Sequence, residues 1–306
     1  MNVISLFTGA GGLDLGLEAA GFSTRLCVEK DPDAVTTLKH NRLNFFPQLL
    51  EEDIYEDLIE NVVDDVIARA VELVGHRSQN SLLCGGPPCQ PFSKSGYWSN
   101  FDSKRLEDPR ANTLTNYLKV LEGLLPEVFL LENVPGIGFN EKSEGIQFLE
   151  DEIKQINLRQ GTNYSFKFKK LNSVQYGVPQ IRERVFVIGQ RDGEEISFPP
   201  QTHSLNAADL FLPEATTAWD AIGHLDTAES AADENLMPRG KWGPLLPSIP
   251  EGENYQYHTE RGKGKAIFGY RTRYWSMLLK LAKTKPSWTL TASPGPAIGP
   301  FHWKSR

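Results

Sequence analysis

The stretch Asn2-Val3-Ile4-Ser5-Leu6-Phe7-Thr8-Gly9-Ala10-Gly11-Gly12 decides the fold. Residues 2–7 form an apolar run that is typical of a buried strand, and residues 13–20 have the apolar face of a helix. A strand, a glycine-rich turn and a helix favour a doubly wound α/β sheet, whose first turn lies against a nucleotide-like ligand. A tight turn without a ligand is the alternative here, because the spacing after Gly11 departs from the usual G-x-G-x-x-G pattern.

Acidic residues follow the next two predicted strands. Residues 23–28 are predicted as the second strand, and Glu29 after it is placed to bind ribose hydroxyls. The third strand is predicted to end at Asp53 and Ile54, where Asp53 would contact an adenine amino group or simply cap a helix. Residues 55–74 are then predicted as one long helix with a solvated acidic face.

A stiff loop with one thiol follows the fourth predicted strand, residues 81–84. Its sequence is Gly85-Gly86-Pro87-Pro88-Cys89-Gln90-Pro91-Phe92-Ser93. The glycines let the backbone turn sharply, and the prolines fix φ and stiffen the chain. Cys89 is thereby held at a strand end, as a nucleophile would be. An incidental cysteine in a proline-rich turn is the structural alternative, whereas Cys84 is interpreted as a buried strand residue.

Two further segments carry charged side chains at places suited to chemistry. Glu132 directly follows the apolar run 128–131, at the edge where doubly wound sheets hold their ligands, and burial would make it a candidate acid. Arg182 and Arg184 alternate on an extended segment, so both are expected to project to one side and to contact phosphates or base edges. A structurally paired carboxylate and a solvated arginine pair are the alternatives.

The character of the sequence changes after Pro199-Pro200. Residues 1–200 are predicted as a catalytic domain and residues 201–306 as a smaller, irregular one. Residues 239–306 hold twelve Lys and Arg but only three Asp and Glu, although the whole chain has a formal net charge of −7. Basic residues that alternate with Trp and Tyr suit phosphates and displaced bases. We therefore expect Arg261, Arg271 and Arg273 to contact nucleic acid.

Composition excludes several classes of protein. The three cysteines are too few for a disulfide framework and lack the paired spacing of a zinc site, so no metal is expected. The sequence has no apolar run of membrane-spanning length and no signal peptide at its start. A cytoplasmic location, close to the bacterial nucleoid, is the expectation.

The motifs together, in this order, resemble the DNA (cytosine-5)-methyltransferases of bacterial restriction–modification systems. The resemblance rests on residues 7–12, Glu29, Asp53, residues 86–93, residues 132–134 and residues 180–184. It covers residues 1–200, and residues 286–292 resemble the end of the family's target recognition domain. The implied fold is a doubly wound, Rossmann-like sheet that uses S-adenosylmethionine, with an irregular target recognition domain at residues 201–306.

The resemblance also implies a reaction. The Cys89 thiolate would add to C6 of a cytosine flipped out of double-stranded DNA, so that C5 becomes nucleophilic enough to take the methyl group. Glu132 would bind N3 of the base, Arg184 would contact O2, and Arg182 would support the covalent intermediate. Gln90, Ser93 and Ser95 would touch the DNA. S-adenosylhomocysteine would be the product of the cofactor.

A set of residues is implied to bind S-adenosylmethionine. They are Phe7, Gly9, Ala10, Gly11, Gly12, Leu13, Glu29, Lys30, Asp53, Ile54, Gly86 and Pro88. The glycines would pass the methionine part, Glu29 would hold the ribose and Asp53 the adenine amino group.

The sequence departs from the family at its end. The family continues with an Arg-x-Leu-Thr-x-x-Glu block and a helix, whereas this sequence stops at Arg306. We expect either a shortened enzyme or the larger chain of a two-chain enzyme, whose second polypeptide supplies the block and restores activity. Three other functions stay open: an RNA (tRNA) cytosine-5 methyltransferase, a catalytically silent DNA-binding module and, more distantly, a nicotinamide dehydrogenase, which would leave the Cys89 loop unexplained.

Overall fold

Two units make up the chain in the computed structural model. The described residues are 1–88, 112–135, 144–193, 195–205, 211–234, 237–238, 240–291, 295 and 297–304. The first unit comprises Met1–Leu171 and Arg184–Phe198, and the second comprises Asn172–Glu183 and Pro199–Arg306. The chain therefore passes from one unit to the other three times.

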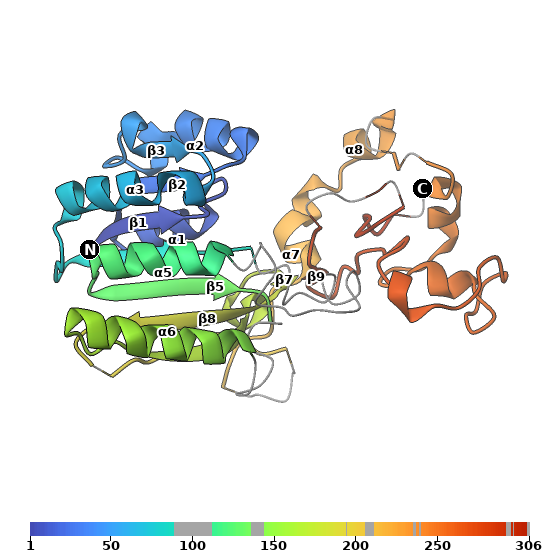
Figure 1. The fold of residues 1–306 in the computed structure, drawn as a ribbon. Helices are drawn as coiled ribbons and strands as arrows, with labels where there is room; N and C mark the ends of the chain where they lie inside the picture. The colour runs from blue at the N-terminus through green and yellow to red at the C-terminus, as the bar shows by residue number, and fades with distance from the viewer. Residues whose placement is uncertain are drawn as a thin grey trace. The chain divides into compact units, whose positions relative to one another are not determined.

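The first unit contains a seven-stranded sheet with the order β3-β2-β1-β4-β5-β8-β6 (Figure 1). Its strands are β1 (Asn2–Leu6), β2 (Ser23–Glu29), β3 (Ile54–Glu56), β4 (Ser81–Gly85), β5 (Val128–Asn133), β6 (Ser165–Asn172) and β8 (Glu183–Gln190). The five strands from β3 to β5 run parallel, and β8 runs antiparallel to β5. The strand order reverses between β1 and β4, and ligands of such sheets bind beyond the strand ends at this point. The predicted doubly wound fold is confirmed.

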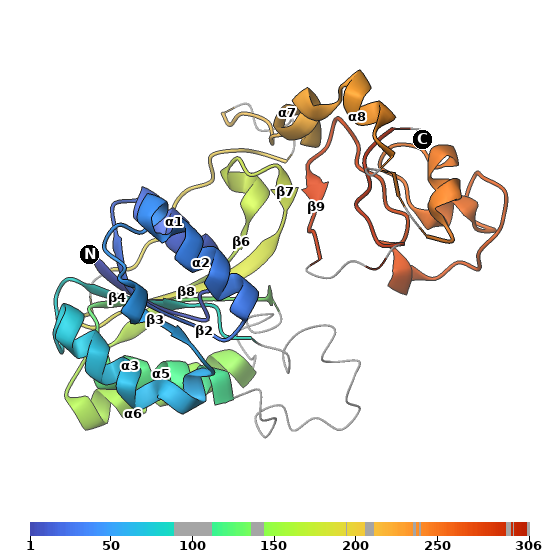
Figure 2. The same cartoon turned by 90° about the horizontal axis from the view of Figure 1, so that it is seen from above.

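Helices cover both faces of this sheet (Figure 2). Helices α1 (Gly12–Ala19) and α2 (Pro32–Phe45) lie on one face, and α3 (Ile59–Val74), α5 (Asn112–Leu124) and α6 (Glu144–Gln160) lie on the other. The alternation of side chains along β1 explains the two layers. Ile4 and Leu6 belong to the large cluster that includes α3, α5 and α6, whereas Val3 packs near Leu13 and Leu17 of α1.

The third strand corrects the prediction made from the sequence. Ile54 begins β3 instead of ending it, and α3 begins at Ile59 rather than at residue 55. The parallel register pairs Glu29 with Glu56, so Asp57 is the first residue beyond the strand. A strand of three residues is too short for a periodic signal, and the acidic pattern around it favoured a helix.

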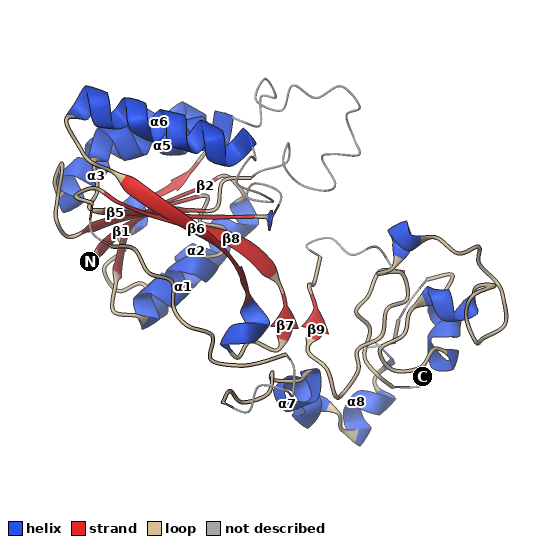
Figure 3. Ribbon diagram, turned by 90° about the horizontal axis from the view of Figure 1, so that it is seen from below, coloured by secondary structure: helices blue, strands red, loops and turns tan. Residues whose placement is uncertain are grey.

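The second unit contains little regular structure. Its helices are α7 (Ala218–Ile222) and α8 (Ala228–Ala232), and its strands are β7 (Gln180–Ile181) and β9 (Ser287–Trp288). Leu246, Ile249, Tyr255 and Leu278 form a buried cluster there. Figure 3 shows β7 and β9 side by side, and they pair in parallel. Residues 172–183, which the sequence pattern assigned to the catalytic domain, thus belong to the second unit.

Candidate active site

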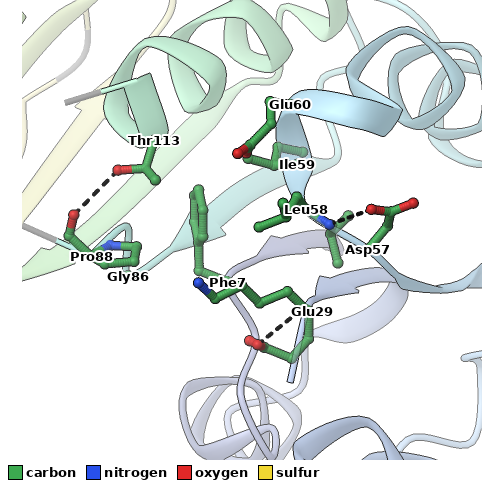
Figure 4. A pocket seen from close by; sticks show the side chains of 11 residues that line it. Phe7, Glu29, Asp57, Leu58, Ile59, Glu60, Gly86, Pro88 and Thr113 are labelled. Atoms are coloured by element: carbon green, nitrogen blue, oxygen red, sulfur yellow. Dashed lines mark hydrogen bonds between the residues drawn. The ribbon is translucent and has the colours of Figure 1, made fainter. Parts of the chain in front are cut away.

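A cavity of about 500 Å³ lies at the carboxyl ends of β1, β2, β3 and β4 (Figure 4). It is lined by Phe7, Val28, Glu29, Lys30, Asp57, Leu58, Ile59, Glu60, Gly86, Pro88 and Thr113. Each parallel strand contributes the residues at its end, because these ends meet at one edge of the sheet. This is the position that the strand-order reversal predicts for a ligand.

Phe7 places an aromatic ring in the cavity from a constrained backbone. Its φ of 56° lies in the left-handed region, which bulky residues rarely adopt. The next residue fixes this conformation, since the Thr8 backbone N–H donates to the Val28 carbonyl at 3.2 Å. Figure 4 shows the ring between the Gly86–Pro88 segment and Leu58.

Gly11 allows the turn after β1 to pack closely against α2. Its φ is 84°, and a Cβ at this position would lie 2.8 Å from a ring atom of Phe46 and 3.0 Å from Leu38. Any other residue would therefore strain the backbone and clash with buried side chains. Gly12 meets no such neighbour within 4 Å.

Glu29 joins this turn to the end of β2. One carboxylate oxygen accepts the Gly9 backbone N–H at 2.7 Å, and the other accepts the N–H groups of Lys30 and Asp31, each at 2.9 Å. Three backbone donors thus fix the carboxylate, which also lines the cavity. A carboxylate has about four acceptor sites, so about one remains for a hydroxyl of a ligand.

Asp53 lies outside the cavity. It is fully buried, and its Oδ1 accepts from Arg69 Nε at 2.6 Å. Ile54 and Leu13 likewise do not line the cavity: Ile54 packs in the α2 cluster, and Leu13 packs near Val3. Asp53 precedes the third strand instead of standing at its end, because β3 begins at Ile54.

Asp57 and Leu58 occupy the position that the sequence argument gave to Asp53 and Ile54. Asp57 Oδ1 accepts from the Leu58 backbone N–H at 2.7 Å and from Asn61 Nδ2 at 2.8 Å. The sequence argument also omitted Val28, Ile59, Glu60 and Thr113, which line the cavity. The sequence does offer Asp57-Leu58 as a second acidic–apolar pair, four residues after Asp53-Ile54. Only the pairing of β3 with β2 shows that this second pair follows the strand.

The loop after β4 is fixed by its neighbours up to Pro88. Asn133 Nδ2 donates to the Pro87 carbonyl at 3.1 Å, and Thr113 Oγ1 donates to the Pro88 carbonyl at 3.2 Å. The last described residue of this loop therefore sits on the cavity wall. Four predicted site residues, Cys89, Gln90, Ser93 and Ser95, lie outside the described residues.

Glu132 and Arg184 form an ion pair across β5 and β8. Glu132 Oε1 lies 2.9 Å from Arg184 Nε, and the two side chains are 27% and 20% exposed. A Cβ on Gly86 would lie 3.2 Å from Glu132 Oε2, so Gly86, which lines the cavity, also lies beside this carboxylate. A half-buried carboxylate beside a guanidinium can bind a planar ligand that presents both a donor and an acceptor edge.

The remaining predicted arginines lie in the second unit. Arg182 falls between β7 and β8; its backbone N–H donates to Asn172 Oδ1 at 3.1 Å. The Arg261 guanidinium lies 4.2 Å from the centre of the Tyr270 ring, a cation–π distance. Arg271 is exposed, and its backbone N–H donates to the Tyr255 hydroxyl at 2.9 Å. The side chain of Arg273 is outside the described part.

The described residues contain neither a candidate metal site nor a candidate membrane-spanning helix. No group of three or more His, Cys, Asp and Glu side chains among them could hold a metal ion. None of the described helices combines the length and the apolarity that a bilayer-spanning segment needs.

Comparisons with known proteins point to one family. The C-5 cytosine-specific DNA methylase family matches residues 1–271. The type II methyltransferase M.SacI of Streptomyces achromogenes is 35% identical over 323 residues, which cover 100% of this chain and 78% of that protein. The type II methyltransferase M.AquIA of Picosynechococcus sp. is 36% identical over 236 residues, or 74% of this chain and 90% of that protein.

A solved structure shares the fold. It is the crystal structure of an E. coli prophage-encoded protein assigned as a DNA modification methyltransferase, with a TM-score of 0.58. The match has 22% sequence identity and covers 97% of this chain and 84% of that one.

Proposed function

Because this chain belongs to the C-5 cytosine-specific DNA methylase family, we propose that its cavity binds S-adenosylmethionine and that the neighbouring Glu132–Arg184 pair binds a flipped cytosine. The chain is a DNA (cytosine-5-)-methyltransferase of the restriction–modification type. The observation that carries the proposal is the place of Gly86, which lines the cavity and leaves no room for a side chain beside the Glu132 carboxylate. A methyl donor in the cavity and a base at the pair would then be neighbours.

The residues of the cavity fit S-adenosylmethionine. Its volume of about 500 Å³ is within the range of small-molecule sites. Phe7 and Leu58 offer apolar surface to the adenine, and Glu29 offers its remaining acceptor site to a ribose hydroxyl. We assign the adenine amino group to Asp57 in place of Asp53. When bound, the cofactor supplies a methyl group activated by a sulfonium.

The chain's own residues would activate the base. Cys89 follows Pro88, which lines the cavity, so its thiolate is proposed to attack C6 of the cytosine. Glu132 would enter as its neutral acid and give its proton to N3, and Arg184 would donate to O2, which neutralises the negative charge that the attack pushes into the ring. C5 would then take the methyl group, and a water molecule would take the C5 proton. The electron pair of the C5–H bond would restore the C5=C6 double bond as the C6–S bond breaks and Cys89 leaves as the thiolate. The base must leave the duplex first, since C6 is otherwise covered by stacked neighbours.

The second unit would supply DNA recognition. Its basic and aromatic stretch suits a nucleic acid, and we propose that Arg182, Arg261, Arg271 and Arg273 contact the DNA, together with Gln90, Ser93 and Ser95 of the Cys89 loop. Residues 172–183 would act with this domain, because they belong to the same unit.

Covalent trapping tests the proposal. Bisulfite sequencing first maps the target sequence. A duplex that carries 5-fluorocytosine at the target cytosine should then form a stable adduct with the wild-type chain in the presence of S-adenosylmethionine. Cys89→Ser should abolish the adduct and the transfer of labelled methyl groups, while cofactor affinity stays within about threefold. Loss of cofactor binding instead would make the loop structural. Methyl transfer to tRNA but not to DNA would favour the RNA alternative.

A further inference from the structure

Two exposed tryptophans contact each other in the second unit. Trp275 is 43% exposed and Trp288 is 41% exposed. Their ring centroids lie 5.1 Å apart with an interplanar angle of 66°, an edge-to-face arrangement. Indoles are large apolar groups, and a pair of them on the surface indicates a binding site.

The backbone presents both indoles rigidly. Trp288 lies in β9 opposite Ile181 of β7, and the next residue, Thr289, donates its hydroxyl to the Ile181 carbonyl at 2.7 Å. The carbonyl of Trp275 accepts from Asn254 Nδ2 at 2.7 Å. A surface that is already ordered loses little conformational entropy when it binds a ligand.

A second tryptophan pair in the same unit has only one exposed ring. Trp219 and Trp303 lie 5.4 Å apart; Trp219 is 41% exposed, but Trp303 is only 5% exposed and its indole N–H donates to Asp226 at 2.8 Å. The Lys283 ammonium lies 4.7 Å from the Trp219 ring centre and so occupies that ring. In the Trp275–Trp288 pair, by contrast, both rings are exposed.

The charge of the sequence stretch that carries both tryptophans favours a polyanion as the occupant of the pair. Residues 239–306 hold twelve Lys and Arg against three Asp and Glu. Two of these carboxylates, Glu251 and Glu260, accept backbone N–H groups of Lys283 and Tyr270. Arg271, exposed, precedes Trp275 by four residues.

We propose that the Trp275–Trp288 pair stacks on a base of the DNA where base flipping opens the duplex. The inference rests on the proposed function and deepens it, because it names side chains that contact bases rather than phosphates. The edge-to-face geometry lets one indole stack on a base while the other supports it from the side. Arg182 directly follows Ile181, the strand partner of Trp288, so the pair adjoins the segment that carries this arginine.

DNA-binding measurements on the full chain test the proposal. Two fluorescent duplexes with the mapped target sequence serve as probes. One is fully paired, and the other has a mismatch at the target cytosine. Trp275→Ala and Trp288→Ala should each weaken binding to the mismatched duplex by roughly 5- to 150-fold, the effect of losing one base–aromatic stack. The slope of log K against log salt should not change, because no charge is removed. Arg271→Gln should instead lower that slope by about 1.

Controls keep the outcome decisive. Leu225→Ala removes a 58% exposed apolar side chain from the same unit and should leave affinity unchanged. Trp275→Leu and Trp288→Leu keep apolar volume without a stacking face, and they replace the alanine variants if those fail to fold. Affinity of the tryptophan variants within twofold of wild type would overturn the proposal and leave the surface to a protein partner. A failure of the proposed function would be seen in a separate assay, because the wild-type chain would then transfer no methyl group to DNA.

Discussion

Asp14 is a fully buried carboxylate in α1 that the proposed chemistry does not use. Asp14 interacts with the Ser5 side chain. In the sheet, Ser5 lies between Cys27 and Cys84 of the two neighbouring strands. Burial raises the pKa of Asp14 to about 6; the Ser5 hydroxyl opposes this shift, and Glu18 adds to it slightly. Burial also raises the pKa of both thiols, so they stay neutral beside it.

The raised pKa of Asp14 predicts a pH-dependent stability. The folded chain binds this proton more tightly than the unfolded chain, whose pKa is near 3.8. The stabilisation that comes from protonated Asp14 is therefore complete below about pH 4 and is lost as pH rises through 6. By pH 7 the free energy of unfolding is lower by about 3 kcal/mol. Asp14→Asn should remove this decrease in the free energy of unfolding, which is measured by urea unfolding at several pH values between 4 and 7. Asp33→Asn, at an exposed carboxylate, is the control; a decrease that survives in Asp14→Asn contradicts the assignment.

Glu132 carries the second prediction at this scale. Glu132→Gln keeps the shape of the side chain but removes the charge that pairs with Arg184 at 2.9 Å. We expect kcat for methyl transfer to fall by at least about 100-fold, as for the loss of an acid–base or charge-stabilising group. Cofactor affinity, measured by calorimetry, should stay within about threefold, since Glu132 does not line the cavity.

A matched ion pair controls for lost stability. Glu122 pairs with Arg159 at 2.7 Å between α5 and α6, and Glu122→Gln should leave the rate unchanged. A similar loss of rate in both variants would mean that the Glu132 effect is structural.

At the scale of the elements, the register of β3 decides which acid lines the cavity where we propose that the cofactor binds. Asp57→Asn should weaken S-adenosylmethionine binding about tenfold and change the melting temperature little, because Asp57 lines the cavity. Asp53→Asn should do the reverse. It removes the negative charge that the Arg69 guanidinium faces and leaves only a neutral amide oxygen as its acceptor, which should lower the free energy of unfolding by about 2 kcal/mol.

Calorimetry with the cofactor and urea unfolding, run on both variants, separate the two assignments. If Asp53→Asn loses affinity and Asp57→Asn does not, the sequence-based assignment of Asp53 would stand against the structure.

Element prediction from the sequence worked where patterns were local and long. The strands β1 and β2 and the helix α1 follow from apolar runs and an apolar helix face, and they are confirmed within one residue of the expected bounds. The strand β3 was misplaced because three residues give no period. Its bounds come from pairing with β2, a contact that the sequence does not display. Asp57 could not be preferred over Asp53 for the same reason.

At the scale of the whole molecule, long-range pairing limited the prediction. Residues 172–183 belong to the second unit because Ile181 pairs with Trp288, more than a hundred residues later. The change of composition after Pro199-Pro200 could not reveal this pairing. The contact between Trp275 and Trp288 was hidden for another reason: the two residues are only 13 positions apart, but the irregular chain between them has no period that predicts which side chains meet.

The uneven charge of the chain leads to a final prediction. Residues 1–238 hold 20 Lys and Arg against 36 Asp and Glu, whereas residues 239–306 hold twelve against three. An acidic body repels DNA, so phosphate contacts should come from the basic stretch. The double variant Arg261→Gln/Arg271→Gln should weaken duplex binding at low salt and lower the slope of log K against log salt by about 2.

The control for this experiment removes lysines from the first unit. Lys39→Gln/Lys154→Gln changes the net charge by the same amount, at side chains that are 36% and 66% exposed. Its slope should equal that of wild type, because counterion release counts only the charges that meet phosphates. Equal slopes in the two double variants would mean that binding follows net charge alone, and the basic stretch would then not be the DNA-binding face.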